Sequence, residues 1–266
     1  MKRIYLFIFI IIIIVFTGCG DKDTVTFKHG ESLYKNSLIE IAKDINTIDI
    51  DINSGNLQIY CWDKKEIKFE AKHTIRDNKT NEELQKQLKK YSIVSEEQEN
   101  TFFFTVDYKG NVKDIQNIYT DVKLTIPRRI SKISISQQHG SIIIEDKFEG
   151  DISAELDSVN SEIKALKGKL SFKCETGNFR LNSGKLSNES FVDINSGSIY
   201  LKTECQEQSK YSFQTQSGNI ELNFPVNSNI LLKSYGTVQN NQFTGVEGNI
   251  VIETSTKMGE ISVNGY

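Results

Sequence analysis

The chain has 266 residues, of which 38% are hydrophobic and 25% charged, and its formal net charge is −3 at pH 7. A chain of this length can bury a sizeable core. Its slightly acidic balance argues against a nucleic-acid partner, which would require a concentrated basic patch, and leaves no polybasic segment for anionic lipid.

The N-terminus has the layout of an export signal. Two basic residues precede an apolar run over 4–16, which is shorter than the roughly 20 residues of a membrane-spanning helix. The residues Phe16-Thr17-Gly18-Cys19 resemble the lipobox of bacterial lipoproteins, in which the cysteine is acylated and the peptide is cut just before it. We therefore expect a signal peptide at 1–18, cleavage between Gly18 and Cys19, and an extracytoplasmic protein held to the membrane by lipid on Cys19. The alternative is an uncleaved N-terminal helix with an incidental cysteine.

Residues 19–46 are polar and irregular, and we expect them to form a lipidated tether to a repeat domain over 47–266. The run Ile48-Asp49-Ile50-Asp51-Ile52 alternates between apolar and polar residues, as a half-buried strand does. It is followed by a turn at 53–55 and by further alternation, so the domain begins with strands.

The period changes to that of a helix between residues 79 and 92. Leu84 and Leu88 are four apart, and Thr80 followed three residues later by Glu83 is typical of a capping box. We predict one inserted helix near 80–91 that covers the end of the strand array. A partner-binding helix is the alternative.

A short phrase recurs from residue 138 onward: a small polar residue, a glycine, and then polar residues alternating with aliphatic ones. Two successive copies are Asn195-Ser196-Gly197-Ser198-Ile199-Tyr200-Leu201 and Gln216-Ser217-Gly218-Asn219-Ile220-Glu221-Leu222. The copies are spaced by 17 to 23 residues, and each interval holds two alternating segments. This spacing predicts an all-β fold, a parallel β-helix or β-solenoid with about 20 residues per coil. A β-sandwich is the alternative.

The lipobox, the alternating entry from Ile48 to Leu57, the helical insertion near Leu84 and the Ser-Gly-Asn-Ile corners occur together. In this combination the chain resembles the bacterial β-strand-repeat family named domain of unknown function 4097, which carries the label adhesin. The resemblance covers residues 46–263. It implies a right-handed β-helix-like fold, a location outside the cytoplasm and a role in surface attachment or envelope maintenance, and it offers no catalytic residue.

The sequence shows no strong catalytic or metal-binding motif. None of the three histidines has a histidine or cysteine at metal-ligand spacing, so we predict no metal and no cofactor; they are His29, His73 and His139. Two groups of neighbouring carboxylates keep a polysaccharide lyase or glycosidase open as an alternative, although solvated turn charges are the simpler interpretation. These groups are Asp146, Glu149 and Asp151, and Asp157 with Glu162.

Three cysteines remain after Cys19. Cys61 and Cys174 follow alternating apolar residues, which predicts buried free thiols. A disulfide between Cys174 and Cys205 is the alternative, since an extracytoplasmic location permits one.

Aromatic residues on the outer faces of strands would suit a binding surface. Trp62, the single tryptophan, follows Cys61 on the opposite side of its strand and is the first candidate, with Tyr60, Tyr200 and Tyr211 as further platforms. The sequence thus favours a non-enzymatic, lipid-anchored envelope module that acts as an adhesin or scaffold, with an envelope protein or glycan as partner. An envelope-stress structural component and a carbohydrate-active enzyme are the alternatives.

Overall fold

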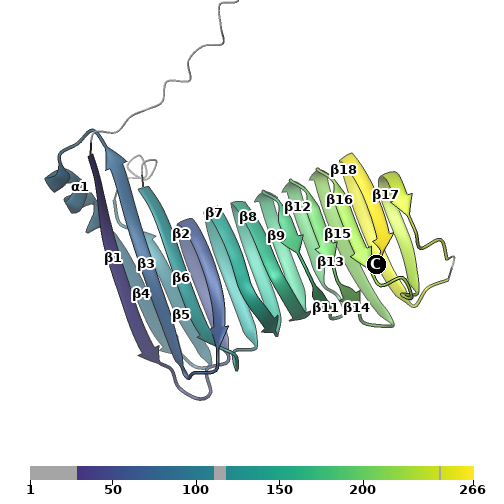
Figure 1. Ribbon diagram of the computed structural model, residues 1–266, viewed down its shortest axis with the longest axis horizontal. Helices are drawn as coiled ribbons and strands as arrows, with labels where there is room; N and C mark the ends of the chain where they lie inside the picture. Colours follow the sequence, from purple (N-terminus) through teal and green to yellow (C-terminus); the bar gives the residue numbers. More distant parts are fainter. Residues whose placement is uncertain (1–28, 111–117, 246) are drawn as a thin grey trace, which may run out of the picture.

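The computed structural model describes residues 29–110, 118–245 and 247–266, which form β-strands and one helix (Figure 1). The strands lie side by side along the length of the molecule, from β1 at one end to β17 and β18 at the other. The elements in chain order are β1 (His29–Glu40), β2 (Thr47–Trp62), β3 (Glu66–Asp77), α1 (Asn81–Leu88), β4 (Tyr91–Gln98), β5 (Thr101–Tyr108), β6 (Ile118–Pro127), β7 (Lys132–Glu149), β8 (Asp151–Gly168), β9 (Leu170–Thr176), β10 (Phe179–Leu181), β11 (Gly184–Leu186), β12 (Phe191–Ser196), β13 (Ile199–Lys202), β14 (Glu204–Cys205), β15 (Ser209–Ser217), β16 (Ile220–Phe224), β17 (Ile230–Asn241) and β18 (Ile250–Gly265).

The parallel strands close into a ring. From β8 the pairing runs through β9, β12, β15, β18, β16, β13 and β10 and then returns to β8, and each step is parallel. The described strands therefore form a closed eight-stranded parallel barrel with further strands outside it. This closure overturns the predicted β-helix or β-solenoid of about 20 residues per coil. The β-sandwich alternative is also wrong, because a sandwich consists of two separate antiparallel sheets.

The ring closes because two long strands belong to both of its sides. The first half of β8 pairs with β9 and its second half pairs with β10. In the same way, β18 pairs with β15 through its first half and with β16 through its second. The alternating pattern indicates that each half is a strand. It does not indicate that the two halves form one bent strand with different neighbours.

Several pairings of the N-terminal strands are antiparallel, which the repeat pattern does not predict, whereas β2 pairs in parallel with β5, β6 and β7. β3 pairs with both β1 and β6 in the antiparallel sense, and β4 pairs with β5 in the same way. β1 lies within the range 19–46, so the prediction of a tether is corrected for His29–Glu40. The antiparallel pairing brings Tyr34 of β1 opposite Lys72 of β3.

Apolar residues of the alternating segments fill the interior. Ile48, Ile50 and Ile52 are almost completely buried, as their alternation predicts. Burial of such side chains stabilises a fold by roughly 25 cal/mol per Å² of apolar area. The inward-facing residues of the repeat phrases are buried as well, apart from the half-buried Leu232 on β17; they are Ile199, Leu201, Phe213, Ile220, Leu222 and Ile230.

The helix α1 lies within the predicted range and packs against β1 and β3. Thr80 is its N-cap: the Thr80 hydroxyl accepts a hydrogen bond from the Glu83 backbone, and the Glu83 carboxylate accepts one from the Thr80 backbone. Leu84 and Leu88 are buried. The helix ends at Leu88, earlier than predicted, because Tyr91 begins β4.

Removal of the N-cap hydroxyl should destabilise this end of the molecule. We expect Thr80→Ala to lower the free energy of unfolding by about 1 kcal/mol, because the Glu83 amide loses its acceptor. Thr80→Ser keeps the hydroxyl and serves as the control. Urea denaturation of both variants checks the prediction, and equal losses in the two would contradict it.

Among the described residues, no helix is long and apolar enough to cross a membrane. The predicted signal peptide, its cleavage site after Gly18 and the lipidation site Cys19 lie outside the described residues.

Candidate functional site

One outer face of the sheet crosses β1, β3, β6 and the second halves of β2 and β7. Strand alternation points every second side chain of these strands away from the core. The register then aligns those side chains into rows across the strands. In one row Lys72 is opposite Asp121, Asp121 is opposite Asn56, and Asn56 is opposite Ser141.

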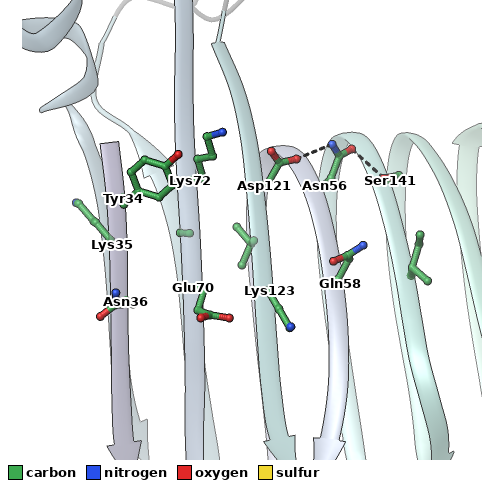
Figure 2. Close-up of a pocket in the computed structure, with 13 residues that line it drawn as sticks. Tyr34, Lys35, Asn36, Asn56, Gln58, Glu70, Lys72, Asp121, Lys123 and Ser141 are labelled. Atoms are coloured by element: carbon green, nitrogen blue, oxygen red, sulfur yellow. Dashed lines mark hydrogen bonds between the residues drawn. The ribbon is translucent and has the colours of Figure 1, made fainter. Parts of the chain in front are cut away.

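A groove of about 660 Å³ lies on this face, and we name it the lysine groove (Figure 2). Its side chains come from strands far apart in the sequence, β1 and β3 on one side and β6, β2 and β7 on the other. It is lined by Tyr34, Lys35, Asn36, Asn56, Gln58, Glu70, Ala71, Lys72, Asp121, Val122, Lys123, Ser141 and Ile143.

The two carboxylates of the lysine groove already have partners. Glu70 accepts a hydrogen bond from Lys68 at 2.9 Å, and this contact, reinforced by the charge of Lys123, lowers the pKa of the Glu70 carboxyl. Asp121 accepts one from the amide of Asn56 at 2.9 Å, and the Asn56 oxygen in turn accepts one from Ser141 at 2.8 Å, as Figure 2 shows.

Two lysines of the groove, Lys72 and Lys123, lie near aromatic rings. The Lys72 ammonium is 5.5 Å from the ring centroid of Tyr34, and the Lys123 ammonium is 4.5 Å from that of Tyr60. Within the part of the chain that the structure describes, Lys72 and Lys123 form no salt bridge. Lys35 donates a hydrogen bond to the carbonyl of Tyr91 at 2.9 Å. Lys35 alternates with the exposed Tyr34 and Asn36, and its ammonium lies on the inner side near His73, so it adds no charge to the outer face. The outer face here carries Lys68, Lys72 and Lys123 against Glu70 and Asp121, which is an excess of one positive charge.

A second groove, of about 550 Å³, continues along the same face and shares Ser141 and Ile143 with the first. We name it the asparagine groove. Its lining includes Asn160, Asn178 and Asn219, together with Ser198, Glu162, Arg180, Tyr200 and Glu221.

The polar residues of the asparagine groove form a ladder from strand to strand. Asn160 accepts a hydrogen bond from the backbone of Asn178 at 3.0 Å, and Asn178 accepts one from the backbone of Ser198 at 2.9 Å. The Ser198 hydroxyl accepts one from the backbone of Asn219 at 3.2 Å. These residues follow the corner of each repeat phrase, so the ladder explains why small polar residues recur there.

Two charged residues of the asparagine groove, Glu162 and Arg180, have local partners. Glu162 lies 3.1 Å from the Lys164 ammonium and accepts a hydrogen bond from Asn182 at 2.7 Å, and both contacts lower the pKa of the Glu162 carboxyl. The Arg180 guanidinium lies 4.1 Å from the ring centroid of Tyr200. Lys164 and Arg180 together balance Glu162 and Glu221, so this groove has no excess of positive charge.

The structure places two of the predicted aromatic platforms on the outer face and buries the third. Tyr60 and Tyr200 lie on the outer face, as predicted, and each has a cation over its ring. Tyr211 is buried and donates a hydrogen bond to the carbonyl of Leu186 at 2.9 Å, so its prediction as a platform is wrong. Its position, two residues before the inward-facing Phe213, is a signal that could have shown this.

Trp62 is half-buried at the end of β2 and lines neither groove. Its indole donates a hydrogen bond to the carbonyl of Glu66 at 2.7 Å, and the Lys64 ammonium lies 4.7 Å from its ring centroid. These contacts close the turn between β2 and β3. A binding role for Trp62 stays a prediction.

The carboxylates considered for an enzyme are engaged locally. Asp146 accepts a hydrogen bond from the Cys61 backbone at 2.8 Å, and Asp151 accepts one from the Lys169 backbone at 2.9 Å. Glu149 pairs with two lysines, Lys147 and Lys167.

The other pair of carboxylates is split between two grooves. Asp157 and Glu162 line different ones, the latter the asparagine groove. A glycosidase needs two carboxyl groups that flank one bond, and Asp157 and Glu162 do not have that arrangement. Across the described ranges, no group of three or more His, Cys, Asp or Glu residues is placed to hold a metal ion.

The cysteines of the described chain are free. Cys61 and Cys174 are buried, as predicted. Cys174 lies on β9 and Cys205 on β14, strands that do not pair with each other, so the alternative disulfide is not present. Burial raises the pKa of the Cys61 thiol to about 11 and that of Cys205 to about 12, which keeps both protonated and unreactive at neutral pH.

The lysine groove contains residues to which sequence reasoning assigned no role. Tyr34 lies in the range predicted as tether, and Lys72 and Asp121 meet only through antiparallel pairing. The alternation Val122-Lys123-Leu124-Thr125-Ile126 is a local signal that directs Lys123 outward.

No protein-family model matches the chain, and neither does any curated protein. The resemblance to the domain of unknown function 4097 family therefore stays a prediction. Several solved structures match the chain at low identity. A proposed cell adhesion protein from Clostridium sporogenes is 13% identical, with 88% of this chain and 100% of that chain covered and a TM-score of 0.33.

Two proteins from Parabacteroides distasonis are similar at the same level. A proposed adhesin is 12% identical, covers 88% of this chain and 97% of that chain, and has a TM-score of 0.46. A proposed lipid binding protein is 16% identical, covers 88% of this chain and 96% of that chain, and has a TM-score of 0.34. Likeness at this level assigns neither a family nor an activity to the chain.

Proposed function

We propose that the protein is a non-enzymatic binding module of the cell envelope whose outer sheet face holds an extended polymeric partner. The observation that carries this proposal is the continuity of the lysine and asparagine grooves. They share Ser141 and Ile143 and run one after the other across neighbouring strands. A long, open surface lined mainly by polar residues suits a chain-like partner better than a small molecule, because small-molecule sites are usually concave and bury most of the ligand.

The proposed location follows from the N-terminal sequence. The residues Phe16-Thr17-Gly18-Cys19 support acylation of Cys19, which would hold the protein on the outer side of a membrane. A tethered binding face of this kind is suited to attachment, since the lipid holds one end while the grooves contact a wall or surface polymer.

A bulky substitution where the two grooves meet tests the proposal, because it should obstruct a partner that extends along both. Ile143 is half-buried on the outer face of β7, and Ile143→Arg should place a long charged side chain in the middle of the continuous surface. We expect this variant to lose at least about tenfold in retention on purified cell wall. Sedimentation of the protein with wall fragments measures this retention.

Ser136→Arg is the matched control, because Ser136 is exposed on the same strand but lies on the opposite outer face, in a different groove. Trp62→Ala tests the aromatic turn separately. Equal retention of Ile143→Arg and Ser136→Arg would contradict the role of the groove face. Absence of retention for the unaltered protein would favour a structural role without a ligand.

A further inference from the structure

We propose that the lysine groove takes a segment of an acidic polysaccharide, with carboxylates of the glycan on Lys72 and Lys123 and a sugar ring on Tyr34. This inference rests on the binding function proposed above and names the class of partner for one end of the groove face.

The lysine groove lies on a face with more cations than carboxylates. Glu70 is held by Lys68 and Asp121 by Asn56, at 2.9 Å in both cases. Lys72 is opposite Asp121 and Lys123 is opposite Glu70, but neither lysine forms a salt bridge among the described residues, and each ammonium lies near an aromatic ring. In a chain with net negative charge, this is a local positive site that selects an anionic ligand.

The spacing of the two lysines also indicates the class of ligand. Lys72 pairs with Asp121 and Lys123 pairs with Glu70 across β3 and β6, so the lysines lie on the diagonal of adjacent antiparallel strands. Diagonal positions of this kind are about 7 to 8 Å apart at the backbone. Figure 2 shows the two side chains pointing in opposite directions along the strands, so their ammonium groups lie farther apart than the backbones. Two cations placed in this way suit separate acidic groups along a polymer better than a single carboxylate.

Aromatic and amide side chains also line the groove. Tyr34 is 67% exposed beside Lys72, and its ring offers a flat face for the C–H groups of a sugar. Asn36 and Gln58 supply side-chain amides, which both donate and accept hydrogen bonds. Hydroxyl groups of a glycan need such mixed partners, whereas a purely ionic ligand would not.

The asparagine groove provides an internal contrast. Its single arginine, Arg180, is stacked on Tyr200, and two carboxylates, Glu162 and Glu221, line the same groove. Lys164 pairs with Glu162, so this groove has no excess positive charge, and an acidic segment is attracted more strongly at the lysine groove. The acidic residues of the partner should bind at the β1 end of the face, and its neutral residues should lie toward β16.

The experiment compares binding of the full-length chain, kept in mild detergent, to polygalacturonate and to its fully methyl-esterified form. These probes share a sugar backbone and differ in charge. We expect tight binding to the acidic form alone, and weaker binding when salt is raised from 50 to 300 mM. The double variant Lys72→Ala/Lys123→Ala should raise the Kd by about 100-fold, as expected for the loss of two charged contacts.

Two controls separate charge from fold. Lys72→Arg/Lys123→Arg keeps both cations and should retain most of the affinity. Lys210→Ala removes a lysine that pairs with Glu253 on the opposite face and should bind as the unaltered protein does. Thermal unfolding of each variant verifies that the fold is intact.

The remaining outcomes are distinguishable. Equal binding of the acidic and esterified forms overturns the assignment of an acidic partner, while the proposed binding function stands. If the protein binds polyglutamate more tightly than polygalacturonate, and Tyr34→Ala does not change that affinity, the partner is an acidic peptide and the assignment of a glycan is overturned. Binding to none of these probes overturns the inference, and retention on cell wall in the Ile143→Arg assay then decides the proposed function independently.

Discussion

Replacement of Gly197 by alanine should destabilise the protein by more than about 3 kcal/mol. Gly197 has φ +148°, and a Cβ atom placed on it would lie 1.9 Å from the backbone oxygen of Gly177 on the neighbouring turn. Relief of this clash would require a backbone shift, because the oxygen belongs to the backbone rather than to a flexible side chain. Chemical denaturation of Gly197→Ala against the unaltered protein measures the loss.

The control for this prediction is Gly30→Ala. A Cβ on Gly30 would meet its nearest atoms at 3.6 and 3.7 Å, an ordinary contact distance. We expect its effect to be within about 0.5 kcal/mol, as is usual for a surface substitution. Equal stability of the two variants would show that the close approach of the repeat corners is not needed.

Acidification should weaken the fold through His73. Its ring is fully buried, is stacked on Tyr91 with 4.1 Å between ring centroids, and lies 3.1 Å from the hydroxyl of Thr120. Burial, and secondly the nearby Lys35 ammonium, lower the pKa of His73 from 6.5 to about 4. Tyr108 completes the cluster through its contact with Tyr91.

The sign of the effect follows from proton uptake. Between pH 6.5 and 4 the unfolded chain binds a proton at His73 and the folded chain does not, so stability present above pH 6.5 falls as the pH is lowered. The full loss is about 3 kcal/mol by pH 4. Denaturant titrations at pH 7.5, 6, 5 and 4.5 measure it.

Two histidine variants isolate this effect. His73→Gln lacks the titrating ring and should flatten the dependence between pH 6.5 and 4.5. His139→Gln replaces an exposed histidine and should keep it. A parallel decline in all three proteins would assign the acid sensitivity to carboxylates, since Glu70 and Glu162 have lowered pKa values and lose their stabilising contacts at lower pH.

Much of the candidate site depends on contacts that no local pattern contains. The outward direction of Lys123 follows from alternation in its own strand. Its position beside Lys72, and that of Lys72 beside Tyr34, comes from antiparallel pairings that join distant segments. By contrast, the asparagine ladder can be anticipated in part, because the repeated phrases place Asn178, Ser198 and Asn219 at equivalent positions.

The sequence by itself determined which side of each strand faces the core, where the helix begins and where the chain must turn. These features depend on alternation, on the Thr80 cap and on the recurrent glycines, all of which act over a few residues. Only the tertiary structure decided that β8 and β18 close a parallel ring, that β1 joins the sheet and that a positive groove forms beside it. The physical reason is that backbone hydrogen bonding between strands has nearly the same chemistry for any partner, so the choice of neighbour is made by the packing of the whole chain.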